Sequence, residues 1–264
     1  MRLVTISFSH YNEKARWALD RFGVEYREQR CLPLLHFGAV AWATGGRGGR
    51  ADRGSTRFST PLLVADDGTR VHDSAAIVRY VSDRFGTDQT TLYPPDHAER
   101  VEQLERRADE RLGPHTRRAA YGFLLAEPRR LVELARRNAG WAQYAAFRAL
   151  GPLPPLLLRR ALGITPQRAQ ASVERVRAEV AALSDELGSA RYLVGDRFTA
   201  ADLAVASLLA PSLLVRPEEG YSAWLPPMHE CPPDTVALAE EVRASPIGRH
   251  ALRMFAEERG PARG

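Results

Sequence analysis

The chain has 264 residues, of which 44% are hydrophobic and 26% charged; these globular values exclude a disordered chain and allow one large domain or two ordinary ones. The net charge of +5 rests almost wholly on arginine, because Lys14 is the only lysine, and acidic residues are interspersed among the arginines. We interpret this pattern as the codon bias of a GC-rich genome and expect no nucleic-acid partner.

The sequence contains no pattern for a disulfide framework, a metal site or a membrane span. Cys31 and Cys231 lie far apart and form no CxxC pair, and the seven histidines show no ligand spacing, so we predict no metal. No apolar run is long enough to cross a bilayer, and the amino terminus lacks the apolar stretch of a signal peptide. We therefore expect a cytoplasmic protein with no membrane partner.

The first part of the chain alternates strand and helix patterns. Residues 3–8 are apolar and β-branched, which predicts a strand. From Tyr11 the apolar residues share one helical face up to Gly23, which is typical of a helix with a glycine at its C-terminal cap. Residues 24–30 predict a second strand. A strand–helix–strand unit of this kind predicts two parallel strands.

An irregular segment and a second small unit follow. In order, we predict a short helix, a mobile loop rich in glycine and arginine, two antiparallel strands joined by an Asp-Asp-Gly turn, and a helix: residues 34–43, 44–55, 60–64, 69–72 and 73–85. Five glycines within residues 45–54 make a helix there unfavourable.

The remaining chain reads as a linker and a set of helices. Residues 86–96 are polar and contain prolines, which is typical of a linker. The predicted helices are 97–112, 114–138, 167–187, 199–214, 234–244 and 247–258, with an interruption near 151–158 at Pro152, Pro154 and Pro155. We therefore predict an α/β domain at 1–86, a linker at 87–97 and an all-α domain at 98–264.

Two short motifs stand at turns of the amino-terminal domain. The run from Ser9 to Leu19 places a serine, a histidine, a tyrosine and an asparagine where the first strand meets the first helix. Thr60-Pro61 enters the third strand directly before the hairpin. A serine hydroxyl together with the N–H groups of a helix start suits an anion.

Two further motifs begin helices. Asp73-Ser74 opens the helix after the hairpin, where N–H groups and a hydroxyl suit a carboxylate and the acid suits an ammonium group; helix capping is the alternative interpretation. Thr199 and Asp202 fit a capping box, with Phe198 and Leu203 at staple positions. This last motif has a structural role, and we assign no chemistry to Asp202.

These motifs and the element order resemble the cytosolic glutathione S-transferases of the bacterial type. The resemblance implies an α/β thioredoxin-like domain followed by an all-α helical bundle, a cis Thr60–Pro61 bond and a homodimer. It implies glutathione, or another small thiol, as cosubstrate rather than a bound cofactor. The residues that it implies for glutathione binding are His10, Asn12, Thr60, Pro61, Asp73 and Ser74.

The resemblance further implies that the cosubstrate sulfur is the nucleophile and attacks an apolar electrophile, as in detoxification. Ser9 is our first candidate to donate a hydrogen bond to the sulfur, and Tyr11 is the alternative. Lowering the thiol pKa by about two units corresponds to about 2.7 kcal/mol of preference for the thiolate. His10 stands where the family often has proline, and Asn12 where it often has cysteine or serine, so thiol–disulfide exchange through a protein cysteine is not expected there.

The sequence leaves the second substrate and a rival function open. The candidates to face the electrophile are Tyr11, Arg107, Arg111, Tyr121 and Phe123. The candidates to bind the glycine carboxylate of glutathione are Arg47, Arg50 and Arg53, with solvent exposure as the alternative. The rival function is a non-catalytic carrier of haem, porphyrin or another planar anion, with His10 or His72 as a ligand.

Overall fold

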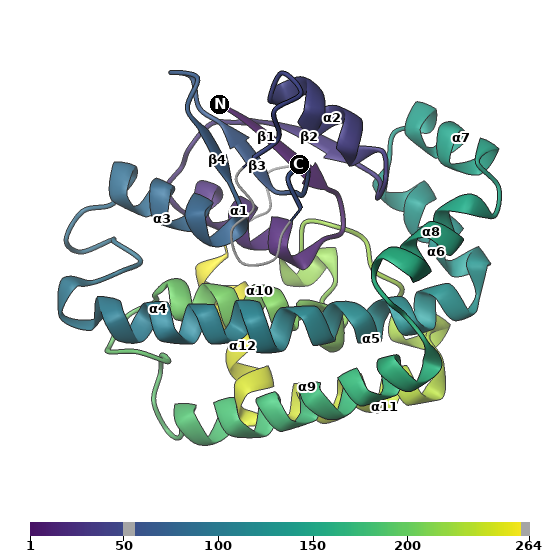
Figure 1. Ribbon diagram of the computed structural model, residues 1–264. Helices are drawn as coiled ribbons and strands as arrows, with labels where there is room; N and C mark the ends of the chain where they lie inside the picture. The colour runs from purple at the N-terminus through teal and green to yellow at the C-terminus, as the bar shows by residue number, and fades with distance from the viewer. Residues whose placement is uncertain (50–55, 260–264) are drawn as a thin grey trace.

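The computed structural model describes residues 1–49 and 56–259. The amino-terminal elements are β1 (Arg2–Ile6), α1 (His10–Arg21), β2 (Arg27–Cys31), α2 (His36–Ala43), β3 (Leu62–Val64), β4 (Arg70–His72) and α3 (Ser74–Phe85). The later helices are α4 (Ala98–Arg107), a π-helical turn (Ala108–Leu112), α5 (Gly113–Ala126), α6 (Pro128–Asn138), α7 (Trp141–Ala149), α8 (Leu153–Ala161), α9 (Pro166–Leu187), α10 (Ala200–Leu213), α11 (Pro233–Ala244) and α12 (Pro246–Glu258), with short 3-10 turns at Pro95–His97, Pro217–Glu219 and Met228–Glu230. The predicted fold class, a thioredoxin-like α/β domain followed by a helical bundle, is confirmed (Figure 1).

The strands form one mixed sheet in the order β2-β1-β3-β4. β1 pairs in parallel with β2 and antiparallel with β3, and β3 and β4 form an antiparallel hairpin, as predicted. The three middle residues of β1 are buried, which suits a central strand covered on both faces. β2 begins at Arg27 rather than at residue 24, because the Val24 N–H still bonds the Leu19 carbonyl in the turn after α1.

Helix α1 lies between the two domains. α3 packs against it on the sheet side, and α10 contacts it from the helical domain (Figure 1). Ala15 and Leu19 belong to the core beneath the sheet, whereas Trp17 and Ala18 belong to the large core of the helical domain. Since both sides are covered, the start of this helix is held at the boundary between the domains.

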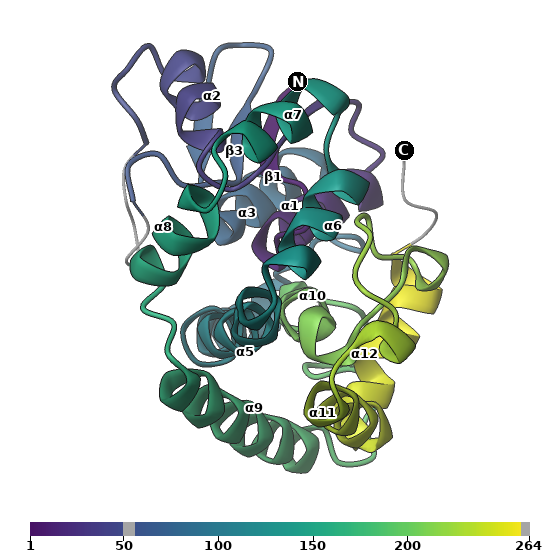
Figure 2. The same ribbon diagram turned by 90° about the vertical axis from the view of Figure 1, so that its right-hand side faces the viewer.

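Helix α10 forms the centre of the helical domain. All of its residues except Pro211 are buried, and α1, α4, α5, α11 and α12 contact it. Figure 2 shows it enclosed by these neighbours, with α9 at the far end of the molecule from the sheet. The predicted capping box of Thr199 and Asp202 is present at its start. Asp202 is also 3.0 Å from the buried His250, which supports its structural role.

The region between α5 and α9 differs from the prediction. Glu127 is extended and divides the predicted helix 114–138, because the residue before a proline, here Pro128, disfavours helical geometry. No helix was expected at 141–149, where α7 lies. The prolines near 151–158 begin α8 instead of interrupting the chain, since the first N–H groups of a helix have no partner to lose.

The predicted linker at 87–97 is packed against both domains. Leu92 is fully buried, and its N–H donates to Ser82 Oγ at 2.9 Å. The Tyr93 hydroxyl donates to Glu105 Oε2 of α4, also at 2.9 Å. The division of the chain at this segment stays a prediction. Among the described residues, no helix has both the length and the hydrophobicity to cross a membrane.

Candidate functional site

A cavity of about 610 Å³ lies between the amino-terminal domain and helices α5 and α8. The predicted catalytic and glutathione-binding residues other than Asn12 line it: Ser9, His10, Tyr11, Thr60, Pro61, Asp73 and Ser74. They come from the starts of α1 and α3 and from the turn before β3, three segments that the sheet topology brings to one edge. Much of the opposite wall is apolar and includes Phe37, Leu124 and Leu158.

Ser9 is the N-cap residue of α1. Its extended backbone, with φ −79° and ψ 127°, is usual for this position, and its carbonyl accepts the Glu13 N–H at 2.9 Å. Its hydroxyl makes no capping hydrogen bond within the described chain, unlike the N-cap side chains of Asp73 and Ser245. The hydroxyl and the N–H groups of the helix start can therefore both meet an anion in the cavity.

His10 is held neutral at the cavity wall. The side chain is 3% exposed, and Nε2 donates to the Gly113 carbonyl at 3.0 Å, which requires that this nitrogen carry the proton. Burial lowers the pKa of His10 to about 3; the Gly113 hydrogen bond opposes this shift and the Arg117 guanidinium adds to it. The imidazole therefore fastens α1 to the start of α5, and its Nε2 does not act as a base.

The Tyr11 hydroxyl donates to the Asp109 carbonyl at 2.9 Å. Burial raises the pKa of the phenol well above its usual value. A Cβ atom at position 113 would collide with the Tyr11 oxygen, so the glycine found there allows this close approach. Because its proton already has a backbone acceptor, Tyr11 is a weaker candidate than Ser9 for a donor to sulfur.

Asn12 lies behind the cavity wall rather than in it. The residue is fully buried, and Nδ2 donates to the Ile6 carbonyl at 3.1 Å and to Thr60 Oγ1 at 3.3 Å. These bonds tie the first turn of α1 to the end of β1 and to the turn before β3. Asn12 therefore holds the first turn of α1 in position beside the site and does not itself line the cavity.

The other two predicted motifs have distinctive backbone geometry. The Thr60–Pro61 peptide bond is cis, as the resemblance implies. Asp73 has a φ of 87°, which is unusual for a residue other than glycine and is often found at binding sites. Its carboxylate accepts the Ala75 N–H at 2.9 Å, so the capping interpretation is confirmed. Ser74 is 1% exposed and still borders the cavity, at the amino terminus of α3.

Helix α5 supplies a wall of the cavity, of which the sequence analysis identified only Tyr121. On α5, four residues line the cavity at intervals of three or four positions: Pro114, Arg117, Tyr121 and Leu124. Glu110 of the preceding π-helical turn also lines it. The guanidinium carbon of Arg117 lies 5.8 Å from the centre of the Tyr11 ring, which puts a cation beside the start of α1. The regular spacing of this stripe was the available signal.

Three residues predicted to face the electrophile do not line this cavity: Arg107, Arg111 and Phe123. Arg107 instead points to α9, where it bonds Glu179 and Glu186, each at 2.9 Å. The π-helical turn between α4 and α5 is wider than an α-helical turn, so a helical face counted through α4 does not continue into α5.

A cluster of charged side chains joins α1 to α4 and the π-helical turn. Lys14 Nζ lies 2.9 Å from Asp109 and 3.0 Å from Glu105; Lys14 and Glu105 are buried, and Asp109 is nearly so. Burial raises the pKa of Asp109 to about 6, although the ammonium group of Lys14 opposes the shift. The pKa of Lys14 is itself raised, because the two carboxylates outweigh the effect of burial. The cluster joins α1 to the wall that carries Asp109.

The remaining predicted groups do not converge on the cavity. Arg50 and Arg53 fall outside the described residues, as does part of the predicted mobile loop, and Arg47 is exposed. Nε2 of His10 bonds a carbonyl, and Nε2 of His72 bonds the Ser59 carbonyl at 2.7 Å, so neither presents that nitrogen to haem. Within residues 1–49 and 56–259, no cluster of three or more His, Cys, Asp or Glu side chains could hold a metal ion.

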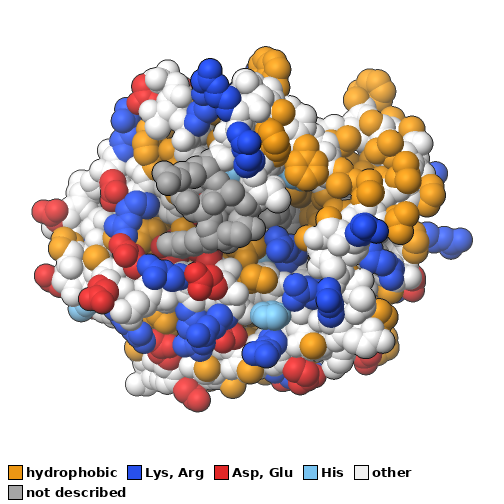
Figure 3. All heavy atoms as spheres, viewed as in Figure 1, with side chains coloured by type: hydrophobic (Ala, Val, Ile, Leu, Met, Phe, Trp, Pro, Cys, Tyr) orange, Lys and Arg blue, Asp and Glu red, His pale blue; other side chains and the backbone are white. Residues whose placement is uncertain are grey.

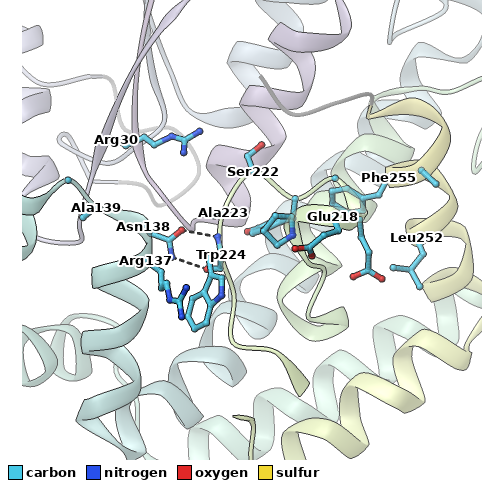
Figure 4. A pocket seen from close by; sticks show the side chains of 16 residues that line it. Arg30, Arg137, Asn138, Ala139, Glu218, Ser222, Ala223, Trp224, Leu252 and Phe255 are labelled. Atoms are coloured by element: carbon cyan, nitrogen blue, oxygen red, sulfur yellow. Dashed lines mark hydrogen bonds between the residues drawn. The ribbon is translucent and has the colours of Figure 1, made fainter. Parts of the chain in front are cut away.

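A wider hollow of about 1130 Å³ lies between the ends of β2 and α6 and the chain from Pro217 to Trp224 (Figure 4). Figure 4 shows Asn138 joined to the Trp224 backbone, whose N–H donates to Oδ1 at 2.9 Å and whose carbonyl accepts from Nδ2 at 2.8 Å. The Arg137 guanidinium lies over the Trp224 ring. Because these groups bind one another and no predicted site residue is present, the smaller cavity is the functional candidate.

Comparison with protein families matches both parts of the chain. The glutathione S-transferase N-terminal domain matches residues 8–84, and the glutathione S-transferase C-terminal domain matches residues 166–232. The two matches together span more than half of the chain. This chain belongs to the glutathione S-transferase family. The predicted catalytic and glutathione-binding residues of this transferase-family protein lie within the first match.

Solved structures of family members share the fold at low sequence identity. The transferase CsGST63524 of Ceriporiopsis subvermispora, in complex with glutathione, is 15% identical, with a TM-score of 0.62 over 97% of this chain and 96% of that chain. A glutathione S-transferase from Methylobacillus flagellatus with glutathione bound is 17% identical, with a TM-score of 0.53 over 95% and 98%. The β-etherase LigF from Sphingobium is 19% identical, with a TM-score of 0.57 over 96% and 98%. No curated protein matches the sequence.

Proposed function

We propose that this protein binds glutathione, or a similar small thiol, in the 610 Å³ cavity and conjugates the whole thiol, through its sulfur, to an apolar electrophile. One observation carries the proposal: the Ser9 hydroxyl, without a capping bond in the described chain, meets the Thr60–Pro61 turn and the start of α3 at one cavity. Membership of the family and the glutathione bound in related structures support the identity of the thiol.

The cavity has a suitable group for each part of the tripeptide. The amino terminus of α3 and the Ser74 hydroxyl suit the carboxylate of the γ-glutamyl end, and the Asp73 carboxylate suits its ammonium group. The backbone of Thr60, directly before β3, suits the peptide part through strand-like pairing. Bound in this way, the thiol lies towards Ser9.

Ser9 would act on the sulfur by stabilising its anion. A hydroxyl hydrogen bond and the positive end of α1 favour the thiolate, and a pKa lowered by about two units corresponds to about 2.7 kcal/mol. The thiol proton leaves to solvent. The thiolate electron pair then forms a carbon–sulfur bond with the electrophile, whose leaving group departs with the bonding electrons. The apolar wall of α5 and α8 binds the electrophile, and Arg117 stabilises negative charge that develops on it.

Substitution of Ser9 tests this mechanism. We expect Ser9→Ala to lower the rate of glutathione conjugation to chlorodinitrobenzene about tenfold or more, and to raise the pKa of the bound thiol measured by thiolate absorbance. Ser9→Thr keeps a hydroxyl and should retain most of the activity. Tyr11→Phe is the matched control. It removes a hydroxyl whose proton already bonds the Asp109 carbonyl, so we expect a smaller loss of rate than in Ser9→Ala.

An unchanged rate in folded Ser9→Ala would remove Ser9 from this role. Calorimetry that detects no heat with glutathione or another small thiol would refute the binding site itself. Saturable hemin binding without conjugation would instead support the carrier function. The homodimer implied by the family and the cytoplasmic location stay predictions, which light scattering and cell fractionation measure.

A further inference from the structure

Exposed apolar side chains concentrate at one end of the molecule. Among the described residues, the large exposed hydrophobic side chains other than Phe85 belong to α2, α7, α8 and the turn between α7 and α8. We call them the apolar face: Phe37, Trp42, Trp141, Leu150, Leu153, Leu156 and Leu157. Figure 3 shows hydrophobic side chains gathered over α7 and α8, and Figures 1 and 2 both place α2 and α7 at the end opposite α9. A gathered surface of this kind indicates a binding face.

The most exposed members are the side chains that gain most from leaving water. Trp42 of α2 is 75% exposed, and Trp141 at the start of α7 is 84% exposed. On α8, Leu153, Leu156 and Leu157 share the outer face at a helical spacing, whereas Leu158 packs into the core. A helix that only had to fold would carry polar residues on its outer face. The packing of the described chain therefore does not account for these leucines.

Charge identifies the occupant of the apolar face. The sequence from Leu134 to Val173 includes α7 and α8 and contains six arginines and no acidic residue, although acidic residues are mixed with arginine in most other helices. Arg148 on α7 and Arg160 on α8 are exposed. α2 contains no acidic residue either. Surfaces that lie on anionic bilayers are rich in tryptophan, leucine and arginine and contain few acidic residues.

We propose that the apolar face binds the surface of a bilayer containing anionic lipids. Trp42, Trp141 and the outer leucines of α8 enter the interface between headgroups and acyl chains, where indole and leucine side chains are favourable. Arg148 and Arg160 pair with the lipid phosphates. The protein lies on the membrane without spanning it. This proposal of peripheral binding replaces our expectation that the protein has no membrane partner.

The apolar face continues into the cavity. Phe37 of α2 belongs to both. Leu158 and Ala161 of α8, and Leu162 directly after it, also line the cavity. An apolar compound dissolved in the bilayer therefore reaches the cavity along an apolar path. This last step rests on the proposed function, whereas binding of the bilayer does not.

Vesicle co-sedimentation of the full chain tests the proposal. We expect binding to mixed phosphatidylcholine–phosphatidylglycerol vesicles, weaker binding to phosphatidylcholine alone, and loss of binding as salt rises. The double variant Leu156→Gln, Leu157→Gln should lower the affinity about tenfold. Phe85→Gln, at the exposed apolar residue outside the apolar face, is the matched control and should bind as the wild type does.

Two charge-reversal substitutions test the electrostatic contribution to vesicle binding. Arg148→Glu with Arg160→Glu should weaken binding to the mixed vesicles and leave binding to phosphatidylcholine nearly unchanged. Arg175→Glu, exposed on α9 at the opposite end, should have no effect. Circular dichroism and glutathione calorimetry on each variant show that the fold and the cavity are intact, so a failure of vesicle binding is distinguished from a failure of the proposed function.

Two outcomes overturn the proposal. One is a wild-type protein that does not sediment with the mixed vesicles. The other is equal binding by the wild type and the double leucine variant. If the double leucine variant instead converts a dimer to a monomer in sedimentation velocity while vesicles bind neither protein, the apolar face joins two copies of this chain and the bilayer assignment is wrong.

Discussion

The imidazole of His10 joins the start of α1 to the start of α5 through one hydrogen bond, and its burial gives that bond a pH dependence. Nε2 donates to the Gly113 carbonyl, and burial lowers the pKa of His10 to about 3. In the unfolded chain the same ring has a pKa of about 6.5. As pH falls from about 6.5 to about 3, the unfolded state takes up a proton that the folded state refuses, so stability falls with pH over this window.

The substitution His10→Gln isolates this effect. Glutamine keeps an N–H donor for the Gly113 carbonyl but does not titrate. We expect the wild type to lose stability more steeply than His10→Gln as pH falls below about 6.5, by up to about 1.4 kcal/mol per pH unit. His36, whose pKa burial lowers to about 4, and Asp109, whose raised pKa acts in the opposite direction, are present in both proteins and cancel in the comparison.

Urea unfolding at a series of pH values measures the difference. Parallel stability curves for the two proteins would show that His10 protonates as readily in the folded state as in the unfolded state. A constant offset between such parallel curves would report only the change in packing that glutamine causes.

Residues of the candidate site divide into those that local sequence could predict and those that it could not. Ser9, Thr60 and Asp73 lie at the ends of short elements, where the sequence shows both the residue type and the turn. Arg117 lies inside a helix, and its side faces the cavity only because of how α5 packs against the first domain. Arg107 was assigned to the wrong side, because a π-helical turn leaves no clear mark in the sequence.

Among the elements, α1 is joined to α4 and the π-helical turn by the ammonium group of Lys14 and by the hydrogen bond from the Tyr11 hydroxyl to the Asp109 carbonyl. Lys14 is fully buried, and its ammonium group faces the carboxylates of both Glu105 and Asp109. Removal of the ammonium group would take away the cation that these two carboxylates share. Breaking a buried pair in this way is far more costly than losing an exposed one.

We expect Lys14→Met to lower the free energy of unfolding by about 3–5 kcal/mol, because methionine fills the space of the lysine stem but removes the buried cation that the Glu105 and Asp109 carboxylates share. Arg136→Met on α6 is the matched control: the Arg136–Glu133 pair is on the surface, and its loss should not measurably change stability. Chemical denaturation of both variants measures this. Equal midpoints for the two variants would contradict a structural role for the cluster.

Element prediction succeeded where the hydrophobic period was strong and failed between α5 and α9. β1, α1 and α3 have apolar residues at their expected period and clear turn or cap residues at their ends. α10 is apolar on almost every side, and its capping box marks its start. α7 is rich in alanine and has few polar residues to define an outer face. α8 begins with prolines that resemble a break and then exposes leucines, so its pattern reflects its surface as well as the core.

Across the whole molecule, the two domains share one core through α1. Trp17 is fully buried, lies 4.8 Å from the Phe255 ring centre, and donates its indole N–H to the Glu258 carbonyl at 3.2 Å. Glu13 and Arg259 form a buried pair at 2.9 Å. α1 thus presents an indole and a carboxylate whose partners stand at the other end of the chain. The predicted linker separates two family modules in sequence, but the packing joins them.

The predicted consequence is a single folding unit. A fragment of residues 1–86 would expose Trp17 to water and remove the Arg259 partner of Glu13, which would keep only Arg16. Its remaining core consists of two small clusters on the two sides of the sheet, which is little for independent stability. We expect the fragment to show no cooperative urea transition, while the full chain unfolds in one. Hydrogen exchange with mass spectrometry in rising urea would follow each part of the full chain, and residues 1–86 and 98–259 should lose protection at the same concentration. Arg259→Leu should lower that concentration for both parts together; a first domain that keeps its protection after the second has lost it would show that α1 does not couple them.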